Sequence, residues 1–207
     1  ALISLTTMTR MIEEQRQQIY DVVLRETMRL SRLVNDMLEL SRLQSGTASL
    51  SRSVFAPLPL FNLIHETYSA YAEDYQQTFV YDVPEDLPSV WGNPDRTQQV
   101  LIVLLDNAFK YTPEGGVVTL SACAEGNVVR VRVRDTGVGI PEADMPRIFE
   151  RFYRVDKARS RAAGGTGLGL SIAKEIIRQH EGKLLLVDRP GPGTTLRMEL
   201  KREGPKA

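Results

Sequence analysis

The chain has 207 residues, of which 42% are hydrophobic and 25% are charged, as expected for a folded globular protein and not for a disordered one. Its 26 basic and 26 acidic residues cancel, so no overall charge draws the chain to nucleic acid or to an anionic membrane. The single cysteine, Cys123, excludes an intramolecular disulfide and a cysteine-rich metal site, and its strand-like setting predicts a buried, inert thiol.

No apolar run approaches the roughly 20 residues of a membrane span, and no signal peptide opens the sequence. These features predict a soluble, cytoplasmic piece with no direct membrane contact. Because the chain begins at Ala1 in the middle of a helical pattern, we expect a fragment of a longer protein, whose parent would be anchored in a membrane.

The first segment, residues 1–46, has the pattern of amphipathic helices. It contains no proline, and Gly46 follows the last apolar residues at the position where helices commonly end. Apolar residues recur at steps of three and four between Ile19 and Leu40. A polar stretch, EEQRQQ at 13–18, predicts a break and so a helical hairpin, and two hairpins would form a four-helix bundle in a homodimer. Alternatively, the hairpin packs on its own domain.

Residues 47–57 are expected to be a linker with a first strand, and residues 58–207 a second domain with mixed elements. Asn93, Pro94 and Asp95 together give a helix start signal. Grouped helices and tight polar turns between strands predict an α+β fold, a two-layer sandwich with helices on one face of a mixed sheet. The expected helices are 59–75, one from 94, a short one from 141, and 168–181; the expected strands are 78–83, 89–91, 117–124, 127–135, 183–187 and 194–200.

The strand VVRVRVRD alternates with period two, which directs Val129, Val131 and Val133 to one face and the intervening arginines to the other. The arginine stripe is read as the solvated face of a sheet and not as a nucleic-acid patch. Counting on, Asp135 falls on the apolar side, just before Gly137 and Gly139, where a planar ligand has room to approach. Alternatively, Asp135 accepts hydrogen bonds from its own turn.

On the helix VLIVLLDNAFKYTP, Asn107 lies on the apolar stripe at helical spacing. Its carbonyl oxygen is a hard ligand of the kind that suits Mg²⁺, and Lys110 and Tyr111, three and four residues on, can reach the same ligand. The alternative is that Asn107 satisfies a backbone group inside the core.

The stretch GGTGLGLS, residues 164–171, is a glycine-rich loop that opens a helix. It is not a P-loop, because Leu170 stands where the phosphate-binding lysine is required, and the spacing also fails the dinucleotide fingerprint. Unpaired amides at a helix start favour an anion, although an ordinary helix-entry loop has the same composition.

Four motifs in this order and spacing resemble those of sensor histidine kinases: DNAFKYTPEGG resembles the N box, DTGVGI the first glycine box, FERFYR the F box and GGTGLGLS the second glycine box. RLSRLVNDMLELSRLQSG is similar to the second helix of the family's dimerisation and histidine-phosphotransfer domain. The resemblance covers nearly the whole chain and implies the ATP-binding fold that this family shares with gyrase and the heat-shock chaperones.

The resemblance implies ATP and Mg²⁺ as cofactors and assigns roles to individual residues. Asp135 would accept from the adenine amino group, with Gly137 and Gly139 lining the base pocket, and Asn107 would bind the Mg²⁺. Residues 154–166 would form a mobile lid over the triphosphate. The other implied nucleotide-binding residues are Lys110, Tyr111, Ile140, Phe152, Arg154, Lys157, Arg159, Arg161, Gly165, Thr166, Gly167, Leu168 and Gly169.

The sequence departs from the family pattern at two places. Val103 stands where related ATPases carry a catalytic glutamate, which disfavours direct ATP hydrolysis, although Asp106 lies on the flank of the same helix. The phosphoacceptor string H-E-L-R-T-P is absent, and we expect the two histidines present, His65 and His180, to be structural. The simplest account is truncation just after the phosphoacceptor segment.

The resemblance therefore implies the catalytic core of a protein-histidine kinase. The parent would transfer the γ-phosphoryl of Mg²⁺-ATP to a histidine, for relay to an aspartate of a response-regulator receiver domain, and this fragment would bind ATP without phosphorylating itself. Two alternatives stand beside this interpretation. One is a histidine-less regulatory module that binds nucleotide, and the other is a gyrase-like ATPase.

Overall fold

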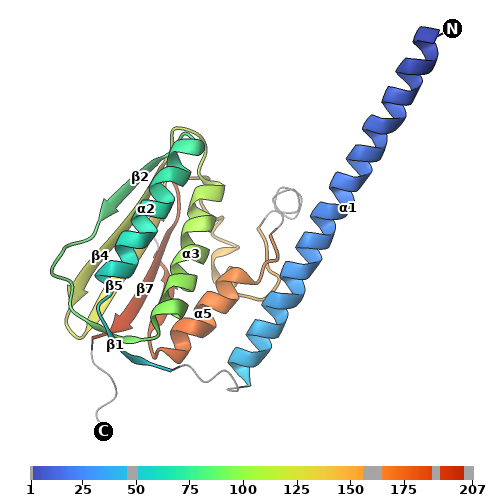
Figure 1. Ribbon diagram of the computed structural model, residues 1–207. Helices are drawn as coiled ribbons and strands as arrows, with labels where there is room; N and C mark the ends of the chain where they lie inside the picture. Colours follow the sequence, from blue (N-terminus) through green and yellow to red (C-terminus); the bar gives the residue numbers. More distant parts are fainter. Residues whose placement is uncertain (1, 46–50, 156–164, 188–191, 203–207) are drawn as a thin grey trace.

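The computed structural model describes residues 2–45, 51–155, 165–187 and 192–202, with the backbone alone for 2–12. A long helix leads into a layered domain (Figure 1). In chain order the elements are α1 (Leu2–Gln44), β1 (Ser53–Phe55), α2 (Leu58–Asp74), β2 (Thr78–Asp82), β3 (Val90–Gly92), α3 (Pro94–Tyr111), β4 (Val117–Glu125), β5 (Val128–Asp135), the 3₁₀ turn η1 (Met145–Arg147), α5 (Gly169–Gln179), β6 (Lys183–Leu186) and β7 (Thr195–Lys201).

The main sheet has five strands in the order β2-β4-β5-β7-β6. β2 runs parallel to β4, and every other pairing in this sheet is antiparallel. Helices α2, α3 and α5 lie together on one face of the sheet (Figure 1). The two-layer α+β fold expected from the sequence is confirmed. The short strands β1 and β3 pair with each other at one end of the domain.

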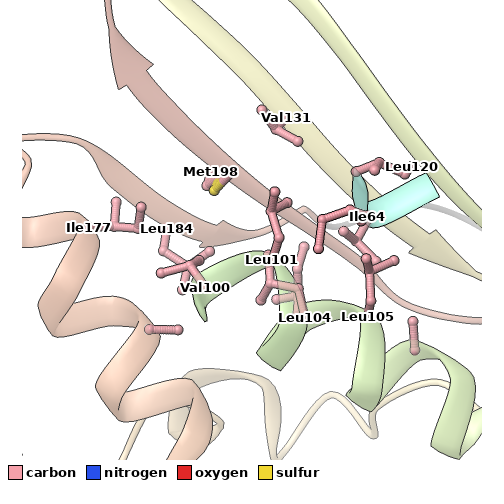
Figure 2. Packing of buried hydrophobic residues seen from close by; sticks show 14 of the residues in the cluster. Ile64, Val100, Leu101, Leu104, Leu105, Leu120, Val131, Ile177, Leu184 and Met198 are labelled. Atoms are coloured by element: carbon pink, nitrogen blue, oxygen red, sulfur yellow. The ribbon is translucent and has the colours of Figure 1, made fainter. Parts of the chain in front are cut away.

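The core fills the space between the helix layer and the sheet. Figure 2 shows Leu101 and Leu105 of α3 turned toward Leu120 and Val131 of the sheet. All four side chains are buried, as the three- and four-residue spacing on the helix and the alternation on the strands require. This packing fixes α3 and β5 relative to each other, and both elements carry predicted site residues.

The open face of the sheet carries the polar side chains of the alternating strands. Val129, Val131 and Val133 are buried, whereas Arg130 and Arg132 are half-buried on the opposite face, so the predicted alternation of β5 is confirmed. The prediction of a buried Cys123 was wrong. Ala122 of β4 takes the buried position, and the same alternation turns Cys123 to the half-buried open face, opposite Arg130.

Helix α1 is continuous over 43 residues, so the hairpin expected from residues 13–18 is absent. The stretch EEQRQQ contains no glycine or proline, and its residues are good helix formers. Glu13 pairs with Arg16, and Gln17 donates to Asp21 over 3.2 Å, each within one turn of the helix. The polar stretch therefore interrupts the apolar face without ending the helix. Among the described residues, no helix is both long enough and apolar enough to cross a membrane.

The helix start at Asn93 is confirmed, because the Asn93 side chain accepts from the backbone amide of Arg96 over 3.0 Å. The helix expected from Pro141 is instead the single 3₁₀ turn η1. Pro146 lies inside this turn, and proline both lacks a backbone donor and disfavours the helical conformation of the residue before it.

Candidate functional site

A cleft of about 370 Å³ opens between α3, the end of β5 and the start of α5. Many of the residues that the sequence singled out meet there, although they come from distant parts of the chain. Those that line the cleft are Asn107, Lys110, Tyr111, Asp135, Gly139, Ile140, Arg154, Gly165, Thr166, Gly167 and Gly169. Gly137, Phe152 and Leu168 do not line it, and Lys157, Arg159 and Arg161 lie outside the described residues.

Asp135 ends β5 on the buried face, with only 6% of its surface exposed. Its Oδ1 accepts from the Gly137 amide over 2.9 Å and from the Thr194 amide over 3.0 Å. Burial raises the pKa of the Asp135 carboxyl, while these two hydrogen bonds act in the opposite direction. The carboxyl thus accepts from its own turn, as the alternative predicted, and it also lines the cleft, where its contact with a ligand stays a prediction.

Gly137 and Gly139, the two glycines after Asp135, have different structural roles. A Cβ on Gly137 would lie 2.2 Å from the carbonyl oxygen of Tyr111, so this glycine lets the loop pack against the end of α3. Gly139 adopts a φ of 72°, which glycine tolerates readily, and it lines the cleft. Only the second glycine is thus placed to contact a ligand.

Asn107 is half-buried on α3 and faces the cleft. Its Nδ2 donates to the Val103 carbonyl oxygen, one turn earlier, over 2.7 Å. The alternative expectation, that the Asn107 side chain satisfies a backbone group, is thus met by Nδ2. Because the two polar atoms of an amide point in different directions, this bond orients Oδ1 as the atom for a cation or a water in the cleft.

Lys110 places its Nζ 5.2 Å from the centre of the Tyr111 ring, within the range of a cation–π contact. Both residues belong to the last turn of α3 and line the cleft with Asn107. A cation, an aromatic ring and an amide thus come from one helix end, which suits a ligand with negative charge and a flat ring.

The glycine-rich loop reaches α5 along the cleft wall. The Phe152 amide donates to the Gly167 carbonyl over 2.9 Å, which joins the two ends of the segment between them. Gly167 has a φ of 75°, whereas Leu168 is fully buried in the core and anchors the start of α5. Phe152 itself is exposed and lies outside the cleft lining.

Arg154 contributes positive charge that the described residues leave without a partner. Its Nε and one terminal nitrogen, Nη2, are buried and donate to no acceptor among the described side chains and backbone. An unpaired buried guanidinium is costly, and it satisfies its donors well with carboxylate or phosphate oxygens. Because Arg154 lines the cleft, the site favours an anionic ligand there.

Val103 and Asp106 are the two cleft residues that the sequence set against the catalytic glutamate of related ATPases. Val103 lines the cleft and has no group that can take a proton from water. Asp106 is exposed at the rim, and its Oδ1 accepts from the Tyr68 hydroxyl over 2.7 Å. Burial, and next this hydrogen bond, raise the pKa of the Tyr68 hydroxyl. Asp106 therefore links α3 to α2 through one of its oxygens.

Thr194 is the residue of the site that sequence reasoning missed. Its amide donates to Asp135, 59 positions away in the chain, and it also lines the cleft. The neighbouring Gly193 indicates a close backbone contact, since a Cβ there would lie 1.9 Å from the Asp135 carbonyl oxygen. A glycine before a strand marks a close approach of backbone, but it does not name the partner.

Neither histidine of the chain lines the cleft. His180 is fully buried, with Nε2 accepting from the Asn93 amide over 2.8 Å and Nδ1 2.7 Å from the Ile176 carbonyl oxygen. His65 stacks on Tyr81, with ring centres 4.3 Å apart. Both contacts are structural, as expected.

Comparison with known proteins identifies the family and the fold. The family model of histidine kinase-, DNA gyrase B-, and HSP90-like ATPases matches residues 92–204. Sensor histidine kinase WalK of Bacillus subtilis is 40% identical over 84% of this chain and 29% of its own length. Drug sensory protein A of Synechocystis sp. is 39% identical over 91% of this chain and 30% of its own length.

Solved structures of histidine kinases have the same fold as this chain. Full-length ShkA in complex with AMPPNP superposes with a TM-score of 0.73 at 30% identity, over 91% of this chain and 40% of that one. The nucleotide-free catalytic domain of the histidine kinase ThkA gives a TM-score of 0.65 at 27% identity, over 74% of this chain and 97% of that one. This chain spans about 30% of the length of the WalK and Drug sensory protein A relatives. It belongs to the histidine kinase-, DNA gyrase B-, and HSP90-like ATPase family, as the catalytic region of a sensor histidine kinase.

Proposed function

We propose that the cleft binds Mg²⁺-ATP and presents its γ-phosphoryl group to a histidine outside this chain, for relay to an aspartate of a response regulator. The single observation that carries the proposal is the meeting of Asp135, Asn107 and Arg154 in one cleft. They supply an acceptor, a hard oxygen ligand and a half-buried cation with two unpaired donors, which match a purine amino group, a metal ion and a phosphate. The solved ShkA relative contains AMPPNP.

Each of these residues would contact a different part of the nucleotide. Asp135, at the buried end of β5, would accept from the adenine amino group, with Gly139 beside the ring. Asn107 would offer Oδ1 to Mg²⁺, which typically takes few protein ligands and keeps phosphate oxygens and water in its shell. Lys110, Arg154 and the amides of the glycine loop would neutralise the phosphates. The bound metal would supply charge stabilisation for phosphoryl transfer, which depends mainly on positioning and electrostatics.

The partner of the reaction would be a histidine from another segment or chain. His180 is fully buried, so no phosphoryl donor can reach it without unfolding α5. The exposed apolar residues of α1 support a homodimer through this helix, in which a second copy covers them. A response-regulator receiver domain is the second proposed partner, on the analogy of the kinase relatives.

Calorimetry with AMPPNP tests the binding role of Asn107. We expect the wild-type chain to bind AMPPNP about tenfold more tightly in excess Mg²⁺ than in a chelator. Asn107→Ala should lose most of this difference between the two conditions. The matched control is Asn127→Ala, an exposed asparagine in the turn between β4 and β5. Equal binding with and without Mg²⁺ in the wild-type chain would show that the metal role is wrong.

A transfer assay separates the kinase from a regulatory module or an ATPase. The chain is mixed with labelled ATP and with a helical domain of a kinase relative that carries its phosphoacceptor histidine. Labelled histidine on the added domain supports the kinase. Binding of ATP without transfer indicates the regulatory module, and phosphate release that Asp106→Asn abolishes indicates an ATPase.

A further inference from the structure

The last turns of α1 pack against the domain beside the cleft. Leu43 is only 1% exposed, and Leu40 is buried with it where α1 lies along α5. Glu39 of α1 pairs with Arg96 and accepts from Gln99 Nε2 over 2.9 Å, both on α3. This combination of buried apolar side chains and a charged pair fixes the end of α1 on the two helices that border the nucleotide cleft.

One contact of α1 reaches the glycine loop itself. Asp36 Oδ2 accepts from the Thr166 hydroxyl over 2.7 Å. Thr166 lies between Gly165 and Gly167 and lines the cleft, and its hydroxyl oxygen is 3.3 Å from the Leu168 amide, which donates to it. A single hydroxyl thus connects the loop with α1 on one side and with the start of α5 on the other.

The loop needs such a tie because glycines surround Thr166. Glycine loses more conformational freedom on ordering than any other residue, so a loop of this composition holds one conformation only when other contacts fix it. Thr166 is the residue between the glycines with a side chain, and its hydroxyl donates to a carboxylate, the stronger kind of hydrogen bond. Asp36 therefore restrains this part of the loop from α1, in addition to the Phe152 amide on Gly167 and the buried Leu168.

We propose that Asp36 is a positioning residue of the nucleotide site. It holds Thr166, and through it the glycine loop, in the place where the loop amides face the phosphates, although Asp36 itself belongs to α1. The inference rests on the proposed function, because it assigns a loop position that matters for nucleotide. By linkage, whatever moves the end of α1 away from the loop lowers nucleotide affinity, and bound nucleotide favours the docked helix by the same factor.

Calorimetric titration with Mg²⁺-AMPPNP tests this inference on the whole chain. We expect Asp36→Ala to weaken binding about fivefold, within the usual range of coupling between sites. Asp36→Asn keeps an acceptor oxygen and should restore affinity to within about twofold of wild type. Thr166→Val should weaken binding to the same extent as Asp36→Ala, and the double variant no further, because both changes remove one bond.

Glu39→Gln is the matched control. It removes the charge from a different contact of the same helix end, but glutamine keeps an acceptor oxygen for Arg96 and Leu40 and Leu43 stay buried, so α1 stays docked and affinity should stay at the wild-type value. An equal loss in Glu39→Gln would overturn the assignment to Asp36. A gain of affinity in both Asp36 variants would also overturn it, since the carboxylate would then act by repelling phosphate.

Hydrogen exchange without nucleotide gives a readout that is independent of binding. The amides of residues 165–170 should exchange faster in Asp36→Ala than in wild type, and at the wild-type rate in Glu39→Gln. If the wild-type chain binds no AMPPNP, the proposed function fails, and this exchange measurement still decides whether Asp36 holds the loop. Unchanged exchange in Asp36→Ala would overturn the inference even where nucleotide binds.

Discussion

At the scale of single residues, Asp135 combines a place in the cleft with a cost in stability. Its carboxyl is buried, and burial raises its pKa above the ordinary value. An acid whose pKa is higher in the folded state than in the unfolded state costs folding free energy as the pH rises from the unfolded value, and the cost is complete above the folded value. Such a group at the end of a strand is more simply explained by a ligand than by the fold.

Base selection by Asp135 can be measured directly. An acceptor that faces the adenine amino group opposes the carbonyl oxygen of guanine, so the wild-type chain should bind ATP at least about tenfold more tightly than GTP. Asp135→Asn places a donor there and should narrow or reverse this preference in competition titrations. Oδ1 of the asparagine can still accept from the Gly137 and Thr194 amides, which keeps the loop folded. Equal affinities of ATP and GTP for the wild-type chain would contradict the assignment.

At the scale of elements, His180 joins the end of α5 to the start of α3. The Asn93 amide donates to Nε2, so the proton sits on Nδ1 and is donated to the Ile176 carbonyl oxygen. A Cβ on Gly92 would lie 2.5 Å from the ring, so glycine at this position lets the imidazole approach the backbone. The neutral ring satisfies both bonds, whereas a second proton would remove the acceptor that the Asn93 amide requires.

The pH dependence of stability follows from this link. Burial lowers the pKa of His180 in the folded state, so the unfolded state binds the proton more readily. The stabilisation is complete above the unfolded value of about 6.5 and is lost as the pH falls below it toward the folded value. Urea unfolding should therefore show a lower free energy of unfolding at about pH 5.5 than at about pH 7.5.

His180→Gln should lower the free energy of unfolding by about 1–3 kcal/mol at neutral pH, because it leaves a buried backbone group without its partner. It should also reduce the loss of stability at low pH. The control is His65→Gln, which removes the other imidazole and leaves the link between α5 and α3 intact. If His180→Gln keeps the full loss at low pH, the titrating group lies elsewhere.

The elements also show how far a sequence can predict this site. Local rules sufficed where a residue and its cause lie close together: the period-two pattern of β5 predicted the buried Asp135, and the cap at Asn93 predicted the start of α3. Contacts between distant segments carried little signal. Thr194 reaches Asp135 across 59 positions and Asp36 reaches Thr166 across 130, and no spacing rule connects such pairs.

The error at residues 13–18 has a different cause. A polar stretch that interrupts the apolar face predicts a break, but the residues in it favour the helix as strongly as their neighbours do. Amphipathic patterning indicates where a helix is buried, whereas helix ends depend on caps, glycine and proline. None of these occurs between Glu13 and Gln18.

At the scale of the whole molecule, α1 carries an apolar face that no described residue covers. Val23 and Leu30 are each 56% exposed and lie seven residues apart, hence on one side of the helix. We expect the chain to self-associate through this face, with sedimentation showing a dimer at tens of micromolar protein. The double variant Val23→Glu with Leu30→Glu should be monomeric, because dimerisation would bury four carboxylates among apolar side chains.

Gln18→Glu with Arg25→Glu is the matched control, since it adds two acids seven residues apart on a different side of α1. This control should remain dimeric. A monomeric wild-type chain at the same concentration, or a dimer that survives the change at Val23 and Leu30, would contradict the proposed homodimer.

The length of α1 determines how far its free end moves when the docked end rotates. At about 1.5 Å per residue the helix is roughly 65 Å long, and about 50 Å of it precede Asp36 and project past the domain (Figure 1). A tilt of about 10° at the docked end sweeps the far end through about 9 Å. A torque applied near the start of α1 would act on the contacts that dock its end, which are the Asp36–Thr166 hydrogen bond, the Glu39–Arg96 pair and the buried Leu40 and Leu43. Motion at the start of α1 would therefore be transmitted to the wall of the proposed nucleotide cleft.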